Sequence, residues 1–267
     1  AHTCGVGRVS DLGFSDQLRD QRSEYFGSLL SLSLMARTSP LQISVIIPVL
    51  NEEEVISDCL NDLRGQEFTE VIVVDGGSCD RTKCLVEKTG FAKLVTTEKC
   101  GRANQMNVGS AVAESDVFLF LHADCRLPDN WPDLVEEAIS DPDVVGGRFR
   151  LGISENTLSF RLIAFFSTLR SRFLGITYGD QAIFSRRSAF ESVGGFPLRQ
   201  IFEDSEFCDV IRRLGQFVML DGEVVSSSRR WRVWGIWRTV FKMWILRLLY
   251  TLSVSDDRLS RLYRNVR

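Results

Sequence analysis

Short apolar runs that end in polar residues constrain the fold of this chain most strongly. Val71–Val74 ends at Asp75, Val117–Leu121 ends at His122 and Asp124, and a third short run, Ile43–Pro48, ends in proline. Runs of this length, without alternation of polar residues, are typical of strands buried on both faces of a parallel sheet. Because a helical pattern follows each run, the sequence predicts an α/β fold with a doubly wound, mostly parallel sheet.

Acidic residues stand where two of these strands end. Asp75 ends the second run and precedes the turn Gly76–Ser78, and Asp124 follows the last run. Ligands of open α/β sheets bind at the carboxyl ends of the strands, and glycines let a ligand approach the backbone. We therefore expect Asp75 near a nucleoside and Asp124 near a cation on a phosphate. The alternative for the first turn is an ordinary β–α connection capped by Asp80.

Helical patterns connect the strands. Residues 52–64 carry apolar side chains at helical spacing, with Asn51 as the predicted N-cap. A shorter strand, Leu94–Thr96, precedes a helix that Gly101 opens, and Arg102 near its N-terminus is a candidate phosphate contact. The alternative for Arg102 is a solvated surface arginine. Neither a P-loop nor a dinucleotide-binding glycine motif follows the first strand, so both of these nucleotide sites are excluded.

Composition excludes several classes of protein. The chain has 267 residues and a net charge of −3, which disfavours nucleic acid as a partner. Its seven cysteines are odd in number and include no Cys-x-x-Cys pair, so we expect neither a zinc site nor a disulfide framework. The two histidines exclude a multi-histidine metal centre. Because no disulfide framework is expected, the expected location is the reducing cytoplasm. No apolar segment is long enough to span a bilayer.

Five motifs resemble, in order, those of family 2 glycosyltransferases with the GT-A fold. They are Ser44–Pro48 with Asn51-Glu52, Val73–Ser78 with Asp80 and Thr82, Leu121–Asp124, Gly194–Phe196, and Glu203-Asp204. The resemblance covers roughly residues 41–232 and implies a GT-A catalytic domain there, with a nucleotide-binding half at 41–125 and an acceptor-side half at 126–232. Residues 1–40 are then a poorly ordered leader, and residues 233–267 form C-terminal amphipathic helices.

The resemblance also implies roles for single residues. Pro48, Asn51, Glu52 and Asp75 would line the pocket for the base and ribose of a UDP- or GDP-sugar, and Arg102 would help to hold the nucleotide. Asp124 would bind the Mg²⁺ or Mn²⁺ ion that bridges the diphosphate. Asp204, with Glu203 as the second choice, would be the general base that deprotonates an acceptor hydroxyl. The usual reaction in this family is direct displacement with inversion at the anomeric carbon.

The chain departs from the family pattern in two places. His122-Ala123-Asp124 replaces the usual Asp-x-Asp, so His122 is either a second metal ligand, a phosphate contact or a histidine satisfied at a strand end. Of the Gln-x-x-Arg-Trp motif of processive synthases only Arg230-Trp231 remains, so polymer synthesis is not expected. The acceptor, a small molecule or a lipid-linked one, is unknown, and its candidate contacts are Tyr178, Asp180 and Gln181.

The segment 231–250 carries tryptophans interleaved with basic residues. This pattern fits an interfacial membrane helix, a lid, a dimer face or a helix docked on the sheet. We favour a docked helix that also touches the inner face of the membrane or a partner. Two rival functions remain open: a non-catalytic nucleotide-sugar binding protein, and a nucleotidyltransferase of related fold. The latter needs a glycine-rich, arginine-containing loop after the first strand, which Val49–Glu52 does not supply.

Overall fold

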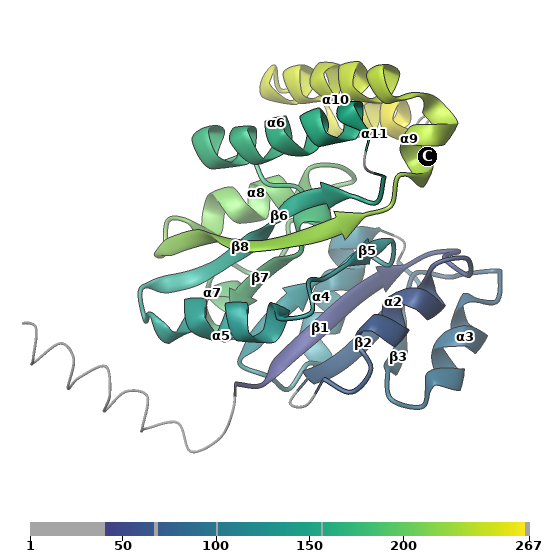
Figure 1. Ribbon diagram of the computed structural model, residues 1–267, viewed down its shortest axis with the longest axis vertical. Coiled ribbons are helices and arrows are strands. Elements are labelled where there is room, and N and C mark those ends of the chain that lie inside the picture. Colours follow the sequence, from purple (N-terminus) through teal and green to yellow (C-terminus); the bar gives the residue numbers. More distant parts are fainter. Residues whose placement is uncertain (1–40, 67–68, 100, 156, 265–267) are drawn as a thin grey trace, which may run out of the picture. The chain divides into compact units, whose positions relative to one another are not determined.

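The computed structural model describes residues 41–66, 69–99, 101–155 and 157–264. The predicted leader, residues 1–40, lies outside the described residues. Within the described part, strands join in one sheet in the order β3-β2-β1-β4-β7-β6-β8-β5 (Figure 1). The strands are β1 (Ile43–Val49), β2 (Thr69–Asp75), β3 (Lys93–Thr96), β4 (Val117–Phe120), β5 (Cys125–Arg126), β6 (Val144–Ile153), β7 (Ile183–Arg186) and β8 (Gln216–Ser226).

The sheet is mostly parallel, as the sequence predicts. β1 pairs in parallel with β2 and β4, β2 with β3, and β6 with β8. β7 runs antiparallel between β4 and β6, and β5 pairs antiparallel with β8. The parallel half places the carboxyl ends of β1, β2 and β4 at one edge, which is where ligands of open α/β sheets bind.

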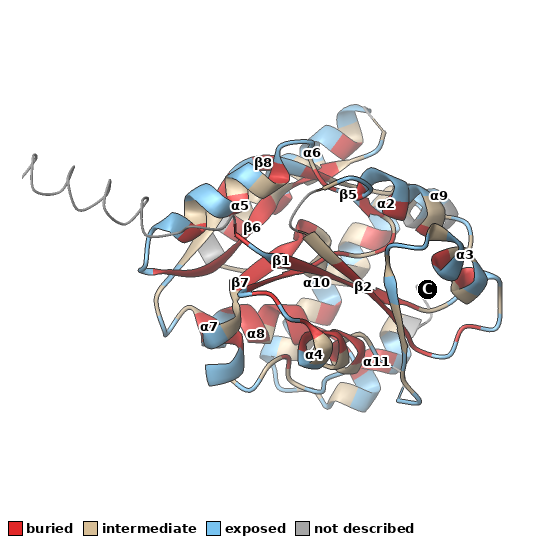
Figure 2. Ribbon diagram, turned by 90° about the horizontal axis from the view of Figure 1, so that it is seen from below, coloured by how far each residue is buried: buried red, intermediate tan, exposed pale blue. Residues whose placement is uncertain are grey.

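Helices connect the strands and cover both faces of the sheet (Figures 1 and 2). They are α2 (Ile56–Asp62), α3 (Thr82–Thr89), α4 (Arg102–Val112), α5 (Trp131–Ser140), α6 (Leu158–Leu174), the 3₁₀ turn η1 (Gly179–Gln181), α7 (Arg187–Ser192), α8 (Glu203–Ile211), α9 (Arg229–Trp234), α10 (Ile236–Thr251) and α11 (Asp256–Arg264).

The alternation of side chains along β1 explains why its sequence is apolar apart from Ser44. Val45 and Ile47 face a core cluster that includes residues of α2 and α5. Ile46 faces the opposite cluster, which contains Met106 of α4 and Phe207 of α8. A strand between two helical layers must be apolar on both faces, and each buried Val or Ile contributes roughly 1.5–3 kcal/mol.

The first helix is shorter than the pattern predicts, and Asn51 is not its N-cap. α2 begins at Ile56, and Asn51 has a left-handed φ of 55°. The loop before α2 is tied instead to the loop after β2: the backbone N–H of Asn51 donates to Ser78 Oγ at 2.9 Å, and that of Glu52 to Thr82 Oγ1 at 2.9 Å. These contacts across 27 to 30 residues override the local helical preference.

The tryptophan-rich segment 231–250 is divided between α9 and α10. Gly235, with φ of 83°, separates α9 from α10. Leu246 of α10 is buried in a small cluster with Ile201, Phe202 and Leu259 of α11. This packing places the inner side of α10 against the turn that precedes α8. In the described residues, the helices are too short or too polar to cross a bilayer.

Candidate active site

A pocket opens where β4 ends, and it brings together six of the residues predicted from the sequence. Those six are Arg102, His122, Asp124, Tyr178, Asp180 and Asp204. The pocket contains about 670 Å³ of empty space, its open mouth included. Residues 80 or more positions apart meet here because the chain passes from β4 through η1 to α8 at the same edge of the sheet.

Asp204 lies in the first turn of α8 and is only 6% exposed. Its carboxylate accepts hydrogen bonds from the backbone N–H groups of Gly179 and Ser205. Burial and the neighbouring carboxylate of Glu203 raise the pKa of Asp204 to about 7, although Arg102 and the two backbone donors act in the opposite direction. A carboxyl group with this pKa exchanges its proton near neutral pH, which is what a general base needs.

Glu203 is not among the residues that line the pocket, and it pairs with Arg102. Its Oε1 lies 2.9 Å from Arg102 Nε, and the Glu203 side chain is 2% exposed. Burial alone would lower the pKa of Arg102, but Glu203, Tyr263, Asp204 and Asp180 together outweigh burial and raise it. The second carboxylate oxygen of Glu203 is buried without a hydrogen-bond partner among the described residues. Arg102 therefore lines the pocket as a cation whose position is fixed by its ion pair with Glu203.

His122, Asp124 and Cys125 could together contact a metal ion. One ligand atom from each lies within 4.8 Å of the others. Burial, with the nearby charge of Asp124, raises the pKa of the Cys125 thiol well above its usual value. Hard cations prefer oxygen ligands, so this thiol is a poor ligand for Mg²⁺ or Mn²⁺. His122 and Asp124 remain, and a hard cation held by one or two protein ligands takes its other ligands from substrate phosphates and water.

Gly179 separates His122 from Asp204. A Cβ atom at position 179 would stand 2.7 Å from His122 Nε2 and 3.3 Å from Asp204 Oδ2. Real Cβ atoms do not approach other atoms as closely as the first of these distances. The absence of a side chain at Gly179 therefore lets the imidazole and the carboxylate share one small space.

The predicted nucleotide residues form a second cluster at the ends of β1 and β2. Asp75 is buried and accepts from the backbone N–H groups of Gly77 and Ser78 at 3.0 Å. The side chain of Asn51 accepts from the backbone N–H of Cys79 at 2.9 Å. These bonds tie the loop after β1 to the loop after β2. Pro48 lies within β1, in register with Val74.

Arg229 joins this nucleotide cluster to the C-terminal helices. Its guanidinium lies 2.6 Å from Glu54 and 3.4 Å from Glu52. Arg229 is the first residue of α9, so the segment that carries Trp231 into the pocket is attached directly to the loop after β1. Exposed ion pairs of this kind contribute little stability, and their effect here is to restrict the position of α9 relative to the loop after β1.

The three residues predicted to contact the acceptor differ in whether they line the pocket. Tyr178 and Asp180 line the pocket. Gln181 is fully buried behind it, where its amide contacts the backbone N–H of Tyr178 and the Ser171 hydroxyl. The acceptor role of Gln181 therefore stays a prediction, and the structure gives this residue a supporting position.

Sequence reasoning missed part of the pocket wall. The additional lining residues are Gly179, Ile201, Phe202, Ser226, Ser227, Trp231, Met243 and Tyr263. Phe202 has a left-handed φ of 63°, which is unusual for an aromatic residue and is found where strain serves a site. Its ring stacks on Tyr178, with centroids 6.0 Å apart, and meets Tyr250 edge-on at 5.0 Å. Local sequence patterns carry no signal for such contacts.

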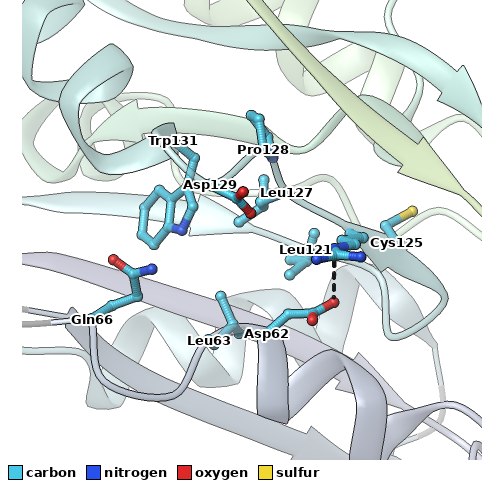
Figure 3. Close-up of a pocket in the computed structure, with 10 residues that line it drawn as sticks. Asp62, Leu63, Gln66, Leu121, Cys125, Leu127, Pro128, Asp129 and Trp131 are labelled. Atoms are coloured by element: carbon cyan, nitrogen blue, oxygen red, sulfur yellow. Dashed lines mark ion pairs between the residues drawn. The ribbon is translucent and has the colours of Figure 1, made fainter.

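A second pocket lies between α2 and the segment after β5 (Figure 3). Its lining residues include Gln66, Trp131 and Cys125, and an ion pair of 3.3 Å joins Arg126 to Asp62 beside it. None of these lining residues is among the predicted catalytic or nucleotide residues. The candidate active site is therefore the pocket that contains Asp124 and Asp204.

Two curated glycosyltransferases match parts of the chain. The glycosyltransferase AglE of Haloferax volcanii is 31% identical over 180 residues, which is 61% of this chain and 58% of AglE. The probable glycosyltransferase YdaM of Bacillus subtilis is 28% identical over 225 residues, 73% of this chain and 52% of YdaM. The chain thus spans little more than half the length of these curated relatives.

A solved structure shares the fold. The mannosyltransferase PcManGT from Pyrobaculum calidifontis, determined with GDP-Man and Mn²⁺, superposes with a TM-score of 0.60 at 20% identity, covering 91% of this chain and 79% of that one. The likeness identifies the curled, mostly parallel sheet with its flanking helices as a GT-A fold. The family model described as "Glycosyl transferase family 2" matches residues 44–194, from β1 through β7 and α7, and therefore includes Asp75 and Asp124. The chain belongs to glycosyl transferase family 2.

Proposed function

We propose that this chain transfers a sugar from a UDP- or GDP-sugar to an acceptor hydroxyl, with inversion and with Asp204 as the general base. The observation that carries the proposal is the buried carboxyl of Asp204, whose pKa is raised to about 7, in one pocket with Asp124 and His122. Family membership supports the reaction class. The donor, the acceptor and the activity of the whole protein are parts of the proposal.

The donor site in this proposal extends from the β1–β2 cluster to the pocket. Asp75, Asn51, Glu52 and Pro48 surround the base and ribose, and the diphosphate reaches Asp124 and Arg102. His122 and Asp124 would hold Mg²⁺ or Mn²⁺, which stabilises the negative charge of the departing diphosphate. The cationic Arg102, fixed by Glu203 at 2.9 Å, adds positive charge at the same place.

Asp204 does the proton transfer in this proposal. Its carboxylate takes the proton of the acceptor hydroxyl as that oxygen attacks the anomeric carbon, and the diphosphate leaves from the opposite face. A single carboxylate suffices because inversion forms no covalent intermediate. The wall of Phe202, Trp231 and Met243 gives the acceptor an apolar and aromatic surface, which suits either the face of a sugar ring or the first part of a lipid chain.

The experiment measures donor binding and turnover separately. A panel of UDP- and GDP-sugars is screened by thermal shift with and without Mn²⁺ or Mg²⁺, and stabilisation by one of these donors is expected. Asp204→Asn should keep that stabilisation and lose turnover by about 10²-fold or more. The matched control is Asp209→Asn on the same helix, whose side chain is exposed and pairs with Arg212.

The outcomes distinguish the rival functions. Binding of a nucleotide sugar without any turnover of the unmodified chain on a broad acceptor panel would favour the non-catalytic binder. Release of inorganic pyrophosphate from a nucleoside triphosphate and a sugar phosphate would favour the nucleotidyltransferase. Turnover that survives Asp204→Asn would remove this residue as the base.

A further inference from the structure

Two helices at the same end of the structure expose apolar stripes with the same spacing. On α6 the exposed residues are Leu158, Leu162, Phe165, Phe166 and Leu169, and on α10 they are Trp237, Phe241, Trp244, Ile245 and Leu248. Each set follows the intervals of one helical face. Figure 1 shows both helices beyond β6 and β8, on the side away from α2 and α3. We call these two stripes together the α6–α10 face.

The exposure of this face is large for a water-facing surface. Trp237 is 66% exposed, Trp244 63% and Phe166 60%. Both helices bury their opposite sides: α10 packs Leu246 against Phe202, and α6 lies against β6. Rows of exposed apolar side chains of this size on a folded chain mark an interaction site.

The charges beside the stripes identify the partner. The sequences of α6 and α10 contain six arginines and lysines and no aspartate or glutamate, although the chain as a whole has a net charge of −3. Arg161 and Arg238 are exposed next to the stripes. Tryptophan and phenylalanine flanked by exposed cations are the composition of a helix that lies in the interface of an anionic bilayer. A second copy of this face would bring like charges together, which disfavours a dimer through it.

We propose that the α6–α10 face docks this chain on an anionic phospholipid bilayer, with both helices lying in the interface and neither spanning it. Met243, on the other side of α10, lines the candidate active site, so the same helix stands between the bilayer and the pocket. An acceptor carried by the membrane would reach the pocket along α10. This last link rests on the proposed function, whereas the membrane contact itself does not.

The test is sedimentation of the full chain with vesicles of phosphatidylcholine alone and of phosphatidylcholine mixed with phosphatidylglycerol. We expect binding to the mixed vesicles, weaker binding to the neutral ones, and a decrease with added salt. Trp237→Ser with Trp244→Ser, and separately Phe165→Ser with Phe166→Ser, should each weaken binding about tenfold. Arg161→Glu with Arg238→Glu should weaken it by at least about tenfold on the anionic vesicles.

The control pair is Arg213→Glu with Leu214→Ser, an exposed cation and an exposed leucine just after α8 and outside the face. It should bind vesicles as the unmodified chain does. Absence of binding to the anionic vesicles, or an equal loss in the control pair, would overturn the proposal. So would a dimer in sedimentation equilibrium that Trp237→Ser with Trp244→Ser dissociates, because a second copy would then cover the face. None of these measurements uses turnover, so they test the membrane contact even if the proposed function is wrong.

Discussion

Arg102 and Glu203, the first residues of α4 and α8, form an ion pair of 2.9 Å behind the candidate active site. The pair joins the nucleotide-binding part of the chain to the helix that carries Asp204. Glu203 is 2% exposed and Arg102 21% exposed, so loss of either partner leaves a largely buried charge without its counter-charge. The pair therefore fixes the Arg102 cation and, through its carboxylate, also affects the proton affinity of Asp204.

Removing the charge of Glu203 should destabilise the chain. Glu203→Gln leaves the buried guanidinium without its counter-charge, so we expect the free energy of unfolding to fall by about 3 kcal/mol in urea titrations. The control is Glu191→Gln, which breaks the exposed Arg187–Glu191 pair of 2.8 Å and should cost less than about 0.5 kcal/mol. Equal effects of the two substitutions would mean that Glu203 is not a buried partner.

The pH dependence of turnover should report Asp204. Its pKa of about 7 predicts that kcat/KM rises with pH and levels off above pH 7, because only the ionised carboxylate accepts the proton. Since the Glu203 carboxylate helps to raise this pKa, Glu203→Gln should shift the midpoint to lower pH. Measurements of kcat/KM across the range on both forms test this. A midpoint that does not move would contradict electrostatic coupling of the two residues.

The same carboxyl group should make stability fall as pH rises. The pKa of Asp204 is raised from 3.8 to about 7 on folding, so between these values the folded chain binds more protons than the unfolded chain. The penalty is absent below pH 4 and complete above pH 7, growing by on the order of 1 kcal/mol per pH unit between them. Asp204→Asn should therefore gain stability relative to the unmodified chain as pH rises. Urea titrations at pH 4 and pH 8 measure the difference, and a gain independent of pH would contradict it.

A side chain at position 179 should disturb the pocket. Gly179→Ala places a Cβ 2.7 Å from His122 Nε2, and the imidazole must move away from Asp204. We expect a loss of about 1–3 kcal/mol in stability and weaker metal-dependent donor binding in calorimetry. The double variant Gly179→Ala with His122→Ala should recover most of the stability, because the clash is gone. Additive losses would show that the two residues are not in contact.

The aromatic stack at the entrance to α8 should be a large contributor to stability. Phe202→Ala removes a ring that is 2% exposed and packs against Tyr178 and Tyr250, so we expect a loss of about 3 kcal/mol. Phe241→Ala, at a position that is 69% exposed, should change stability by less than about 0.5 kcal/mol. Thermal and urea unfolding compare the two, and similar losses would contradict the packing around Phe202.

Several features of the chain could be predicted from local patterns. The central parts of β1, β2 and β4 are apolar on both faces, and this is visible without the structure because burial between two helical layers leaves few polar positions. The acids at the ends of β2 and β4 and at the start of α8 could be recognised as motifs in family order. Local patterns failed where distant backbone contacts prevail, as at Asn51, whose predicted role as a helix cap is replaced by its bond to Cys79.

β8, β5 and α7 were not predicted. β8 pairs with β6 over two register shifts, and Asp221 and Gly222 interrupt its apolar residues, so it lacks the even alternation of an ordinary strand. β5 has two residues and exists only because β8 passes beside it. α7 has six residues, too few for a helical period to be recognised.

The sequence by itself determined the α/β class, the order of the motifs and the identity of the acids at the strand ends. These features depend on short stretches of neighbouring residues, in which buried strands and family motifs can be recognised. Only the tertiary structure decided that Glu203 holds Arg102, that Gly179 makes room for His122 beside Asp204, and that α10 supplies Met243 to the pocket. Each of these relations joins residues from separate elements of the chain. Their distances depend on how the helices pack on the sheet, which no local pattern of residues records.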